Sequence, residues 1–485
     1  MSAQVTVPWS TPVDVADIQG NILRGYRYDY ARHFALHVGD AGKARAFIGS
    51  LLPGESGNDP AVTSAEPWGR DKPAECINLG VTHEGLRALG VPKGALDAFP
   101  EAFREGPAAR AAAPDPDFEE SVGLGDVGDS GPEHWALGGP TTTTVHLMLS
   151  LYTREAGHRE TVSDALRDSF DEAELEEIRA PDADALPDGR VHFGYPDGIA
   201  QPRVGIGNEL PDMQPMVQLG DFLLGAGHTN VYRGNFIGDI PAALGDNATY
   251  GAFRILQQDV FGFEKLLEQL AGVARMGKEE VAAKLMGRWR SNGVPLTLSP
   301  DSDEAKPPIA PDRMNEFDYG PSREHPTYYD DSRGLRCPVG AHIRRLNPRG
   351  SRVMGMPHGR RIMRRAMPYG PAMKQGQPPD DTKRGLVGWF LCGDLEMQFE
   401  FLQRVWVNQD LSTSGLRGTR EPFVGTQPEG GGRFGIRTAD ARDPIGLASM
   451  PNLVTTRGSV YCLLPGIGGL RYLAELAPDS PGGAA

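Results

Sequence analysis

Cysteine is scarce in this chain of 485 residues, which has four, at positions 76, 337, 392 and 462. None stands in a CxxC pair, so the sequence argues against a structural zinc site and against covalent c-type haem attachment, and it gives no disulfide framework. Long apolar runs are also missing, because no window approaches the roughly 18 apolar residues of a membrane span. We therefore expect a globular chain without a membrane segment.

Basic residues are outnumbered, since 49 Lys and Arg stand against 64 Asp and Glu and give a formal net charge of −15. Such a charge disfavours binding to nucleic acid and to anionic membranes, so we expect neither as a partner. The first residues contain no basic region with an apolar core of signal-peptide length and no twin-arginine pair, which predicts a cytoplasmic location. Glycine and proline are abundant, with 62 and 41 residues, and indicate extensive loops.

Hydrophobic patterns predict that strands and helices alternate in both halves of the chain. Strands are predicted over 33–38, 77–81, 141–152, 222–224, 251–256, 385–393 and 459–464. Helices are predicted over 41–52, 82–89, 162–170, 171–178, 261–270, 279–289 and 395–407, with Thr82 as the N-cap of the second. The order in the first half indicates a split βαβ, ferredoxin-like unit, and the second half shares its outline.

One carboxylate stands in a rigid turn, in the segment Gly194-Tyr195-Pro196-Asp197-Gly198. Asp197 cannot be helical there, because Pro196 fixes the backbone and Gly198 admits conformations that other residues avoid. An acid on such a loop either bonds its own backbone as a turn residue or points into a cavity as a catalytic group. The local sequence leaves both alternatives open.

Two further segments concentrate histidine and arginine. CPVGAHIRRLNPR, over 337–349, contains His342, Arg344 and Arg349, and RIMRRAMPYGP, over 361–371, contains Arg364 and Arg365. A single histidine is more often a hydrogen-bonded core residue than a ligand, and a run of arginines is usually a solvated face. If the second segment is a strand, its neighbouring residues point to opposite faces, so only one of Arg364 and Arg365 can face a given site.

The three segments, in this order along the chain, resemble the dye-decolorizing peroxidases, a family of haem enzymes, and in particular its longer bacterial members. The loop matches the family's Gly-x-x-Asp-Gly signature at Gly194, Asp197 and Gly198. The resemblance implies one haem b per chain, with His342 as the proximal iron ligand. It places Asp197 and Arg364 on the distal side of the haem.

The resemblance also implies an α+β fold of two ferredoxin-like halves with antiparallel sheets and surrounding helices. The first half would cover residues 1–205 and the second, which carries the haem, residues 206–485. Arg344 and Arg349 are candidates for binding the haem propionates, because guanidinium groups pair well with carboxylates, and salt bridging is the alternative for each. Glu396 and Asp394 are candidates for the partner of the second ring nitrogen of His342.

The implied function is a peroxidase that uses hydrogen peroxide to oxidise dyes, phenolic compounds and Mn(II) in one-electron steps. Asp197 would move the peroxide proton, and Arg364 would favour cleavage of the O–O bond. Two alternatives remain: a haem-handling protein with little turnover, which the intact Asp197 and Arg364 argue against, and a haem-free protein with the same scaffold. The sequence does not predict the oligomeric state.

Overall fold

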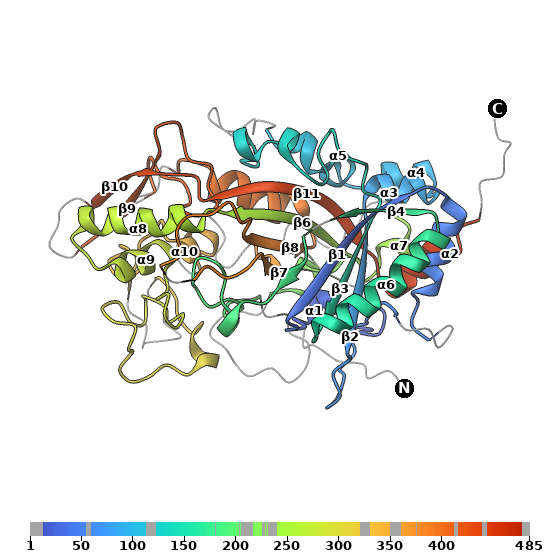
Figure 1. Ribbon diagram of the computed structural model, residues 1–485, viewed down its shortest axis with the longest axis horizontal. Helices are drawn as coiled ribbons and strands as arrows, with labels where there is room; N and C mark the ends of the chain where they lie inside the picture. Colours follow the sequence, from blue (N-terminus) through green and yellow to red (C-terminus); the bar gives the residue numbers. More distant parts are fainter. Residues whose placement is uncertain are drawn as a thin grey trace.

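The computed structural model of the chain describes residues 13–54, 60–112, 123–179, 181–202, 204, 217–225, 228, 230, 240–320, 330–349, 360–374, 376–411, 416–438 and 444–477. Helices surround one large antiparallel sheet in a mixed α+β fold, as predicted (Figure 1). None of the helices in these ranges is long and apolar enough to cross a membrane.

The N-terminal half supplies one side of this sheet, with strands in the order β4-β1-β3-β2. The strands are β1 (Tyr30–Val38), β2 (Glu75–Val81), β3 (Leu147–Thr153), β4 (Leu175–Arg179) and the short β5 (Ala183–Asp184), which pairs with β1. The helices are α1 (Gly20–Leu23), α2 (Ala41–Ser50), α3 (His83–Ala88), α4 (Lys93–Asp97), α5 (Glu101–Arg110) and α6 (Ala156–Glu172). Thr82 is the N-cap of α3, as predicted, because its hydroxyl accepts a hydrogen bond from the backbone nitrogen of Gly85 at 2.9 Å.

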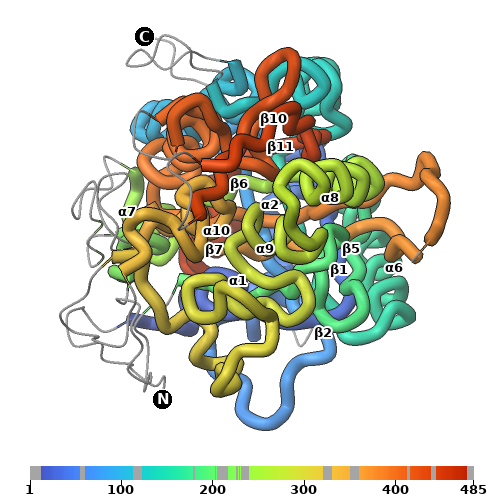
Figure 2. Tube along the Cα trace, turned by 90° about the vertical axis from the view of Figure 1, so that its left-hand side faces the viewer, coloured from blue at the N-terminus to red at the C-terminus, as the bar shows by residue number. Residues whose placement is uncertain are grey.

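The C-terminal half supplies the other side, in the order β11-β6-β8-β7, and β11 joins β2 through the pair of Leu463 and Val81. The strands are β6 (Thr249–Gln258), β7 (Met363–Tyr369), β8 (Gly385–Cys392) and β11 (Val454–Leu464), with β9 (Gly432–Ile436) and β10 (Ile445–Met450) in a separate hairpin. The helices are α7 (Ala242–Gly245), α8 (Val260–Ala274), α9 (Lys278–Met286), α10 (His342–Leu346) and α11 (Ile467–Ala474). Strand β7 therefore lies at the edge of the sheet, and α8, α9 and α10 gather at one end of the molecule (Figure 2).

Two predicted elements were wrong, and a third is a helix of unexpected type. The helix predicted over 171–178 is the end of α6 followed by strand β4, because pairing with β1 outweighs the helical preference of Glu176 and Glu177. The strand predicted over 222–224 is irregular chain after a short 3₁₀ turn at Leu219–Asp221. The helix predicted over 395–407 consists of two π-helical segments, Leu395–Glu400 and Leu402–Val407. The strand predicted over 141–152 begins only at Leu147, and α11 was not predicted.

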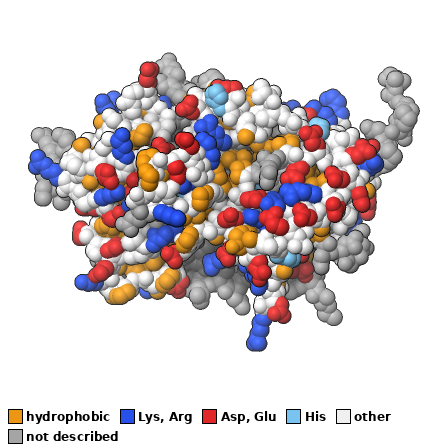
Figure 3. All heavy atoms as spheres, viewed as in Figure 1, with side chains coloured by type: hydrophobic (Ala, Val, Ile, Leu, Met, Phe, Trp, Pro, Cys, Tyr) orange, Lys and Arg blue, Asp and Glu red, His pale blue; other side chains and the backbone are white. Residues whose placement is uncertain are grey.

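The sheet is covered on both faces, so its central strands are buried throughout. In β3, Leu149 and Leu151 belong to the core on one face, whereas Met148 and Tyr152 belong to the core on the other. This alternation follows from the period of two along a strand. Outside the cores, acidic and basic side chains are interspersed on the face shown in Figure 3.

Candidate active site

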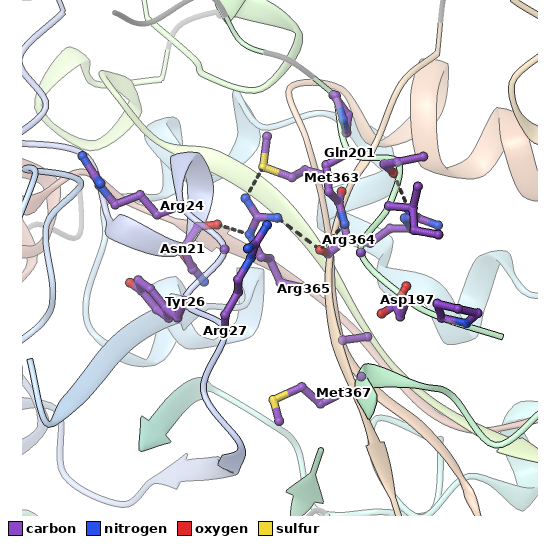
Figure 4. A pocket seen from close by; sticks show the side chains of 18 of the residues that line it. Asn21, Arg24, Tyr26, Arg27, Asp197, Gln201, Met363, Arg364, Arg365 and Met367 are labelled. Carbon is purple, nitrogen blue, oxygen red and sulfur yellow. Dashed lines mark hydrogen bonds between the residues drawn. The ribbon is translucent and has the colours of Figure 1, made fainter. Parts of the chain in front are cut away.

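A cavity of about 1810 Å³ extends along both sides of the edge strand β7. Its lining comes from the loop over 196–202, from residues 361–368 on and before β7, from residues 311–316 and from residues 21–29. Strand β7 divides the labelled residues of Figure 4: Asp197, Gln201 and Arg364 lie on one side, and Tyr26, Arg27 and Arg365 on the other. The cavity therefore joins the predicted acid loop to the predicted arginine strand.

The acid loop, residues 194–202 around Asp197, takes its shape from two glycines and from hydrogen bonds near both of its ends. Gly194 and Gly198 have φ angles of 87° and 73°, which L-residues with side chains rarely adopt. The buried Tyr195 donates a hydrogen bond from its hydroxyl to the carbonyl of Ala282 in α9 at 2.9 Å. Asp197 lies exposed at the cavity, and its carboxylate makes no hydrogen bond or ion pair with the described part of the chain. Among the described residues, the side chain of Asp197 thus makes no hydrogen bond to its own backbone, which is the bond that a turn-forming aspartate would make.

Gln201 ties this loop to β7. Its amide oxygen accepts a hydrogen bond from the backbone nitrogen of Arg364 at 3.2 Å, and its amide nitrogen donates to the carbonyl of the same residue at 3.1 Å. The side chain thus occupies the unpaired edge of β7 as a neighbouring strand would. The guanidinium of Arg364 donates to the carbonyl of Ala200 at 2.5 Å. Loop and arginine are held together by these three bonds.

The two neighbouring arginines diverge, as strand alternation predicts. Arg365 donates from Nε to the carbonyl of Asn21 at 2.7 Å and also contacts the sulfur of Met363, on the side of β7 away from Asp197 (Figure 4). Arg364 lies on the same side as Asp197. Only Arg364 is therefore arranged to act together with the acid.

His342 begins the short helix α10, and its ring is bound on one side only. Its Nδ1 lies 2.9 Å from Oε1 of Glu421, a fully buried carboxylate whose other oxygen accepts hydrogen bonds from the backbone nitrogens of Phe423 and Val424. Its Nε2 has no hydrogen-bond partner within the described ranges, and the side chain is 20% exposed. One ring nitrogen is thus fixed by an anion while the other remains available to a ligand.

The predicted partners of His342 were wrong. Glu396 accepts from the backbone nitrogen of Ala102 at 3.2 Å and lies near Arg110, and Asp394 caps the π-helical segment through the backbone nitrogen of Met397. Both carboxylates therefore have other partners and do not contact His342. The correct partner, Glu421, lies 79 residues after the histidine in a loop without a periodic pattern.

Arg344 and Arg349 have different environments although they lie close in sequence. Arg344 is buried and bonds the carboxylate and carbonyl of Asp331 at 3.1 and 2.9 Å, which favours the salt-bridge alternative over propionate binding. Arg349 lines the cavity, donates to the carbonyl of Phe317 at 2.8 Å and stacks on that ring at 3.7 Å. The structure thus separates a structural arginine from one that faces the cavity.

Further cations surround Arg349 and Arg364. Burial, followed by the like charge of Arg349, lowers the pKa of Arg288 to about 9, and the same two causes lower the pKa of Arg361 to about 9. Repulsion of this kind disfavours four clustered guanidinium groups unless an anion lies among them. Three of these cations, Arg349, Arg361 and Arg364, line the cavity, where they can pair with an anion, whereas Arg288 is absent from the lining and donates to the carbonyls of Gly293 and Met314.

The structure brings Asp197, Arg364 and Arg349 into one cavity lining, while His342 and Arg344 are absent from it. The neighbouring ranges 321–329 and 350–359 lie outside the described residues. Sequence reasoning missed Glu421, Gln201 and Arg361 as site residues. Gln201 follows the Asp197 motif closely and Arg361 begins the second arginine segment, so proximity in sequence could have indicated these two, but not Glu421.

Comparisons with known proteins show which sequences this chain resembles. No family model matches the chain. The chain is 28% identical to a dye-decolorizing peroxidase of Mycena epipterygia over 95% of its own length and 87% of that protein. It is 27% identical to a multifunctional dye peroxidase of an Amycolatopsis species, over 96% of this chain and 98% of that one.

Solved structures of dye-decolorizing peroxidases also resemble this chain. A dye-decolorizing peroxidase in complex with 2,6-dimethoxyphenol superposes with a TM-score of 0.76 at 26% identity, covering 95% of this chain and all of that one. A fungal DyP-type peroxidase from Auricularia auricula-judae superposes with a TM-score of 0.78 at 22% identity, covering 96% of this chain and 100% of that chain, and this likeness shows a shared fold.

Proposed function

We propose a mechanism for this chain from the premise that it belongs to the dye-decolorizing peroxidase family and is a peroxidase. In this proposal His342 is the protein ligand of a haem iron, and Asp197 and Arg364 act on hydrogen peroxide. The observation that carries it is the joint placement of Asp197 and Arg364 on one side of β7, fixed by Gln201 and Ala200.

The chemistry of His342 fits a haem. A neutral imidazole nitrogen bonds iron well, and a carboxylate on the other ring nitrogen fixes the tautomer and increases the basicity of the ligand. Glu421 provides that carboxylate, and the Nε2 atom is the one left to bond iron. Arg349, and with it Arg361, would pair with the propionates, since haem b carries two carboxylates and the cation cluster is suited to bind an anion. Within the described ranges only His342 has its ring bound by a fully buried carboxylate, which supports one haem b per chain.

Bound haem would supply the iron that takes oxidising equivalents from peroxide and passes them to reductants in one-electron steps. The chain's own residues would prepare the peroxide for this reaction. The carboxylate of Asp197 lies at the cavity and has no hydrogen-bond partner among the described residues. It can therefore accept the proton from one peroxide oxygen and return it to the other. Arg364 brings a fixed positive charge beside it, which stabilises the negative charge that develops on the second oxygen as the O–O bond breaks, and this oxygen leaves as water once it has taken the proton from Asp197.

Dyes, phenolic compounds and Mn(II) are the proposed reductants. Phenols find support in the solved relative that binds 2,6-dimethoxyphenol. Mn(II) finds support only in the negative net charge of −15. The second candidate function, haem handling with little turnover, shares His342 and Glu421 but gives no reason for an unengaged carboxylate beside a fixed arginine. A cytoplasmic location stays a prediction.

Replacement of Asp197 by asparagine tests the proposed function. Asparagine has nearly the same shape but cannot take up the peroxide proton, so we expect the second-order reaction with hydrogen peroxide to slow by at least about tenfold. Rapid mixing of haem-loaded protein with peroxide measures this rate. Asp188→Asn is the matched control, because Asp188 is exposed, precedes the same loop and does not line the cavity. Equal rates for both variants and the parent would make Asp197 a structural residue and favour haem handling.

We also propose that the sheet consists of two ferredoxin-like halves, with a boundary near residue 205. Support comes from the strand order: numbered within its own half, each set of four strands follows the order 4-1-3-2. That is the order of a split βαβ unit, in which the first and third strands are central. The residues around the boundary, 203 and 205–216, lie outside the described ranges.

A further inference from the structure

The cavity has a second part, on the side of β7 away from Asp197, which the proposed mechanism does not use. We call this part the tyrosine lobe. Its cationic residues are Arg24, Arg27, Lys72 and Arg365, and its aromatic residues are Tyr26, Tyr28, Trp68 and Tyr152. Figure 4 shows Arg24, Tyr26, Arg27 and Arg365 together on this side of the strand.

The cations of the tyrosine lobe lack anionic partners. Among the described residues, no carboxylate lies within ion-pair distance of any of the four, in a chain whose net charge is −15. Their hydrogen bonds go to carbonyl groups instead: Arg24 donates to Ala65 at 2.8 Å and Lys72 to Arg27 at 3.2 Å. Burial lowers the pKa of Arg365 to about 10, because its guanidinium is partly withdrawn from water. Asp29 is the one acidic residue in the lobe's lining.

The aromatic side chains form a connected group. The ring of Tyr26 lies 5.8 Å from that of Trp68, 5.3 Å from that of Tyr152 and 6.1 Å from that of Tyr28, measured between centroids. Such spacings are those of interacting aromatic pairs, and they offer ring faces and edges to a further ring. Cations already lie over two of them, with Lys72 at 3.6 Å from the centroid of Tyr28 and Arg24 at 5.4 Å from that of Trp68.

Buried polar atoms in the lobe are also without partners. Asn21 is fully buried, lines the cavity beside Tyr26 and Arg365, and neither its amide oxygen nor its amide nitrogen has a hydrogen-bond partner. Buried polar groups in proteins nearly always have a partner, so the unpaired amide of Asn21 in this lining indicates a polar ligand.

We propose that the tyrosine lobe binds an aromatic carboxylate bearing a hydroxyl group. The carboxylate would lie toward Arg27 and Lys72, the ring would pack against Tyr26 and Trp68, and the hydroxyl would reach Asn21. Guanidinium and ammonium groups supply charge-assisted hydrogen bonds to the acid, and the aromatic residues distinguish such a ligand from an inorganic anion. Binding requires neither peroxide nor turnover, so the proposal stands apart from the proposed function.

Calorimetric titration of the purified, haem-loaded protein with 4-hydroxybenzoate tests this site. We expect saturable binding that is at least about tenfold tighter than binding of the neutral analogue 4-hydroxybenzamide, since a hydrogen bond to a charged group exceeds a neutral one by about a tenfold factor. Arg27→Gln and Lys72→Gln should each weaken 4-hydroxybenzoate binding about fivefold or more. The exposed Lys265→Gln, on α8, is the matched control and should change nothing.

Three outcomes would overturn the proposal. The first is no saturable binding. The second is affinity that Arg27→Gln and Lys72→Gln leave unchanged, which would place the ligand on the Arg364 side of β7. The third is displacement of 4-hydroxybenzoate by inorganic phosphate at equal concentration, which would make the lobe a general anion site. Because the signal is heat of binding in resting protein, a loss of peroxide reactivity cannot produce any of these results.

Discussion

Replacing Glu421 with glutamine removes the buried charge behind His342 with little change of shape. The carboxylate accepts three hydrogen bonds on two oxygens: one from His342 at 2.9 Å, one from Phe423 at 2.9 Å and one from Val424 at 2.5 Å. Glutamine offers one acceptor oxygen and an NH₂ group, so either the backbone nitrogens of Phe423 and Val424 lose their acceptor or His342 must change its tautomer. Such a loss costs about 1–3 kcal/mol, and we expect the free energy of unfolding to fall by that amount.

The orientation of the glutamine decides whether the tautomer of His342 changes or only the negative charge beside it is lost. If its NH₂ group faces His342, then Nδ1 must become an acceptor and the ring proton moves to Nε2, the nitrogen proposed to bond iron. If its oxygen faces His342, the tautomer is kept but the negative charge is gone. An anionic partner favours the ferric state, so its loss should raise the ferric/ferrous midpoint potential. A charged hydrogen bond worth about 1.5–3 kcal/mol corresponds to roughly 65–130 mV for one electron.

Thermal unfolding and a spectroelectrochemical titration of haem-loaded protein measure these two effects. Glu396→Gln is the control, because Glu396 also accepts a backbone hydrogen bond, at 3.2 Å, but its side chain is 43% exposed. We expect the control to shift stability by less than about 0.5 kcal/mol and to leave the potential unchanged. If both variants gave the same potential as the parent, Glu421 would not be the partner of an iron-bound histidine.

Three other predictions concern the proposed iron ligand, the register of β7 and a buried histidine outside the site. His342→Ala should lose most of its haem while the protein stays folded, and normally ligated haem at full occupancy, seen in the absorption spectrum, would contradict the assignment. Arg364→Leu should keep haem and lose peroxide reactivity, whereas Arg365→Leu should keep reactivity but lower the melting temperature, because Arg365 bonds buried backbone; the reverse pair of phenotypes would refute the strand register. Burial lowers the pKa of His146 to about 4, so the unfolded chain takes up a proton near pH 6.5 that the folded protein does not, and stability should fall as pH decreases from about 6.5 toward 4. In His146→Gln, whose amide oxygen can accept the bond from Val38, the melting temperature should fall less over that range, and an unchanged slope would show that His146 does not contribute.

Local patterns were sufficient for the parts of the site that depend on adjacent residues. Pro196 and Gly198 fix the backbone around Asp197, and strand alternation separates Arg364 from Arg365, so both features could be predicted from the sequence. Fold class followed in the same way, because the elements of a split βαβ unit each carry their own periodicity. These inferences need no knowledge of which distant segments meet.

Contacts between distant segments could not be predicted. Glu421 reaches His342 across 79 positions, and its loop has no pattern that distinguishes it from Glu396. The different environments of Arg344 and Arg349 depend on Asp331. This residue precedes both arginines in the sequence but bonds only Arg344. In each case the deciding contacts join helix α10 to a loop, and such contacts leave no period in the sequence.

The edge position of β7 explains how a loop can hold Asp197, the proposed catalytic acid, in a fixed place. An edge strand has unpaired backbone groups, which in most proteins must be covered. Here the side chain of Gln201 covers those of Arg364, so the bonds that protect the edge also set the distance between the acid loop and the arginine. Strand alternation then sends Arg365 to the opposite side, where its charge meets Tyr26 and Asn21 instead. One edge strand thus separates the proposed peroxide site from the tyrosine lobe, and the two can differ in ligand because successive side chains of β7 point to opposite sides.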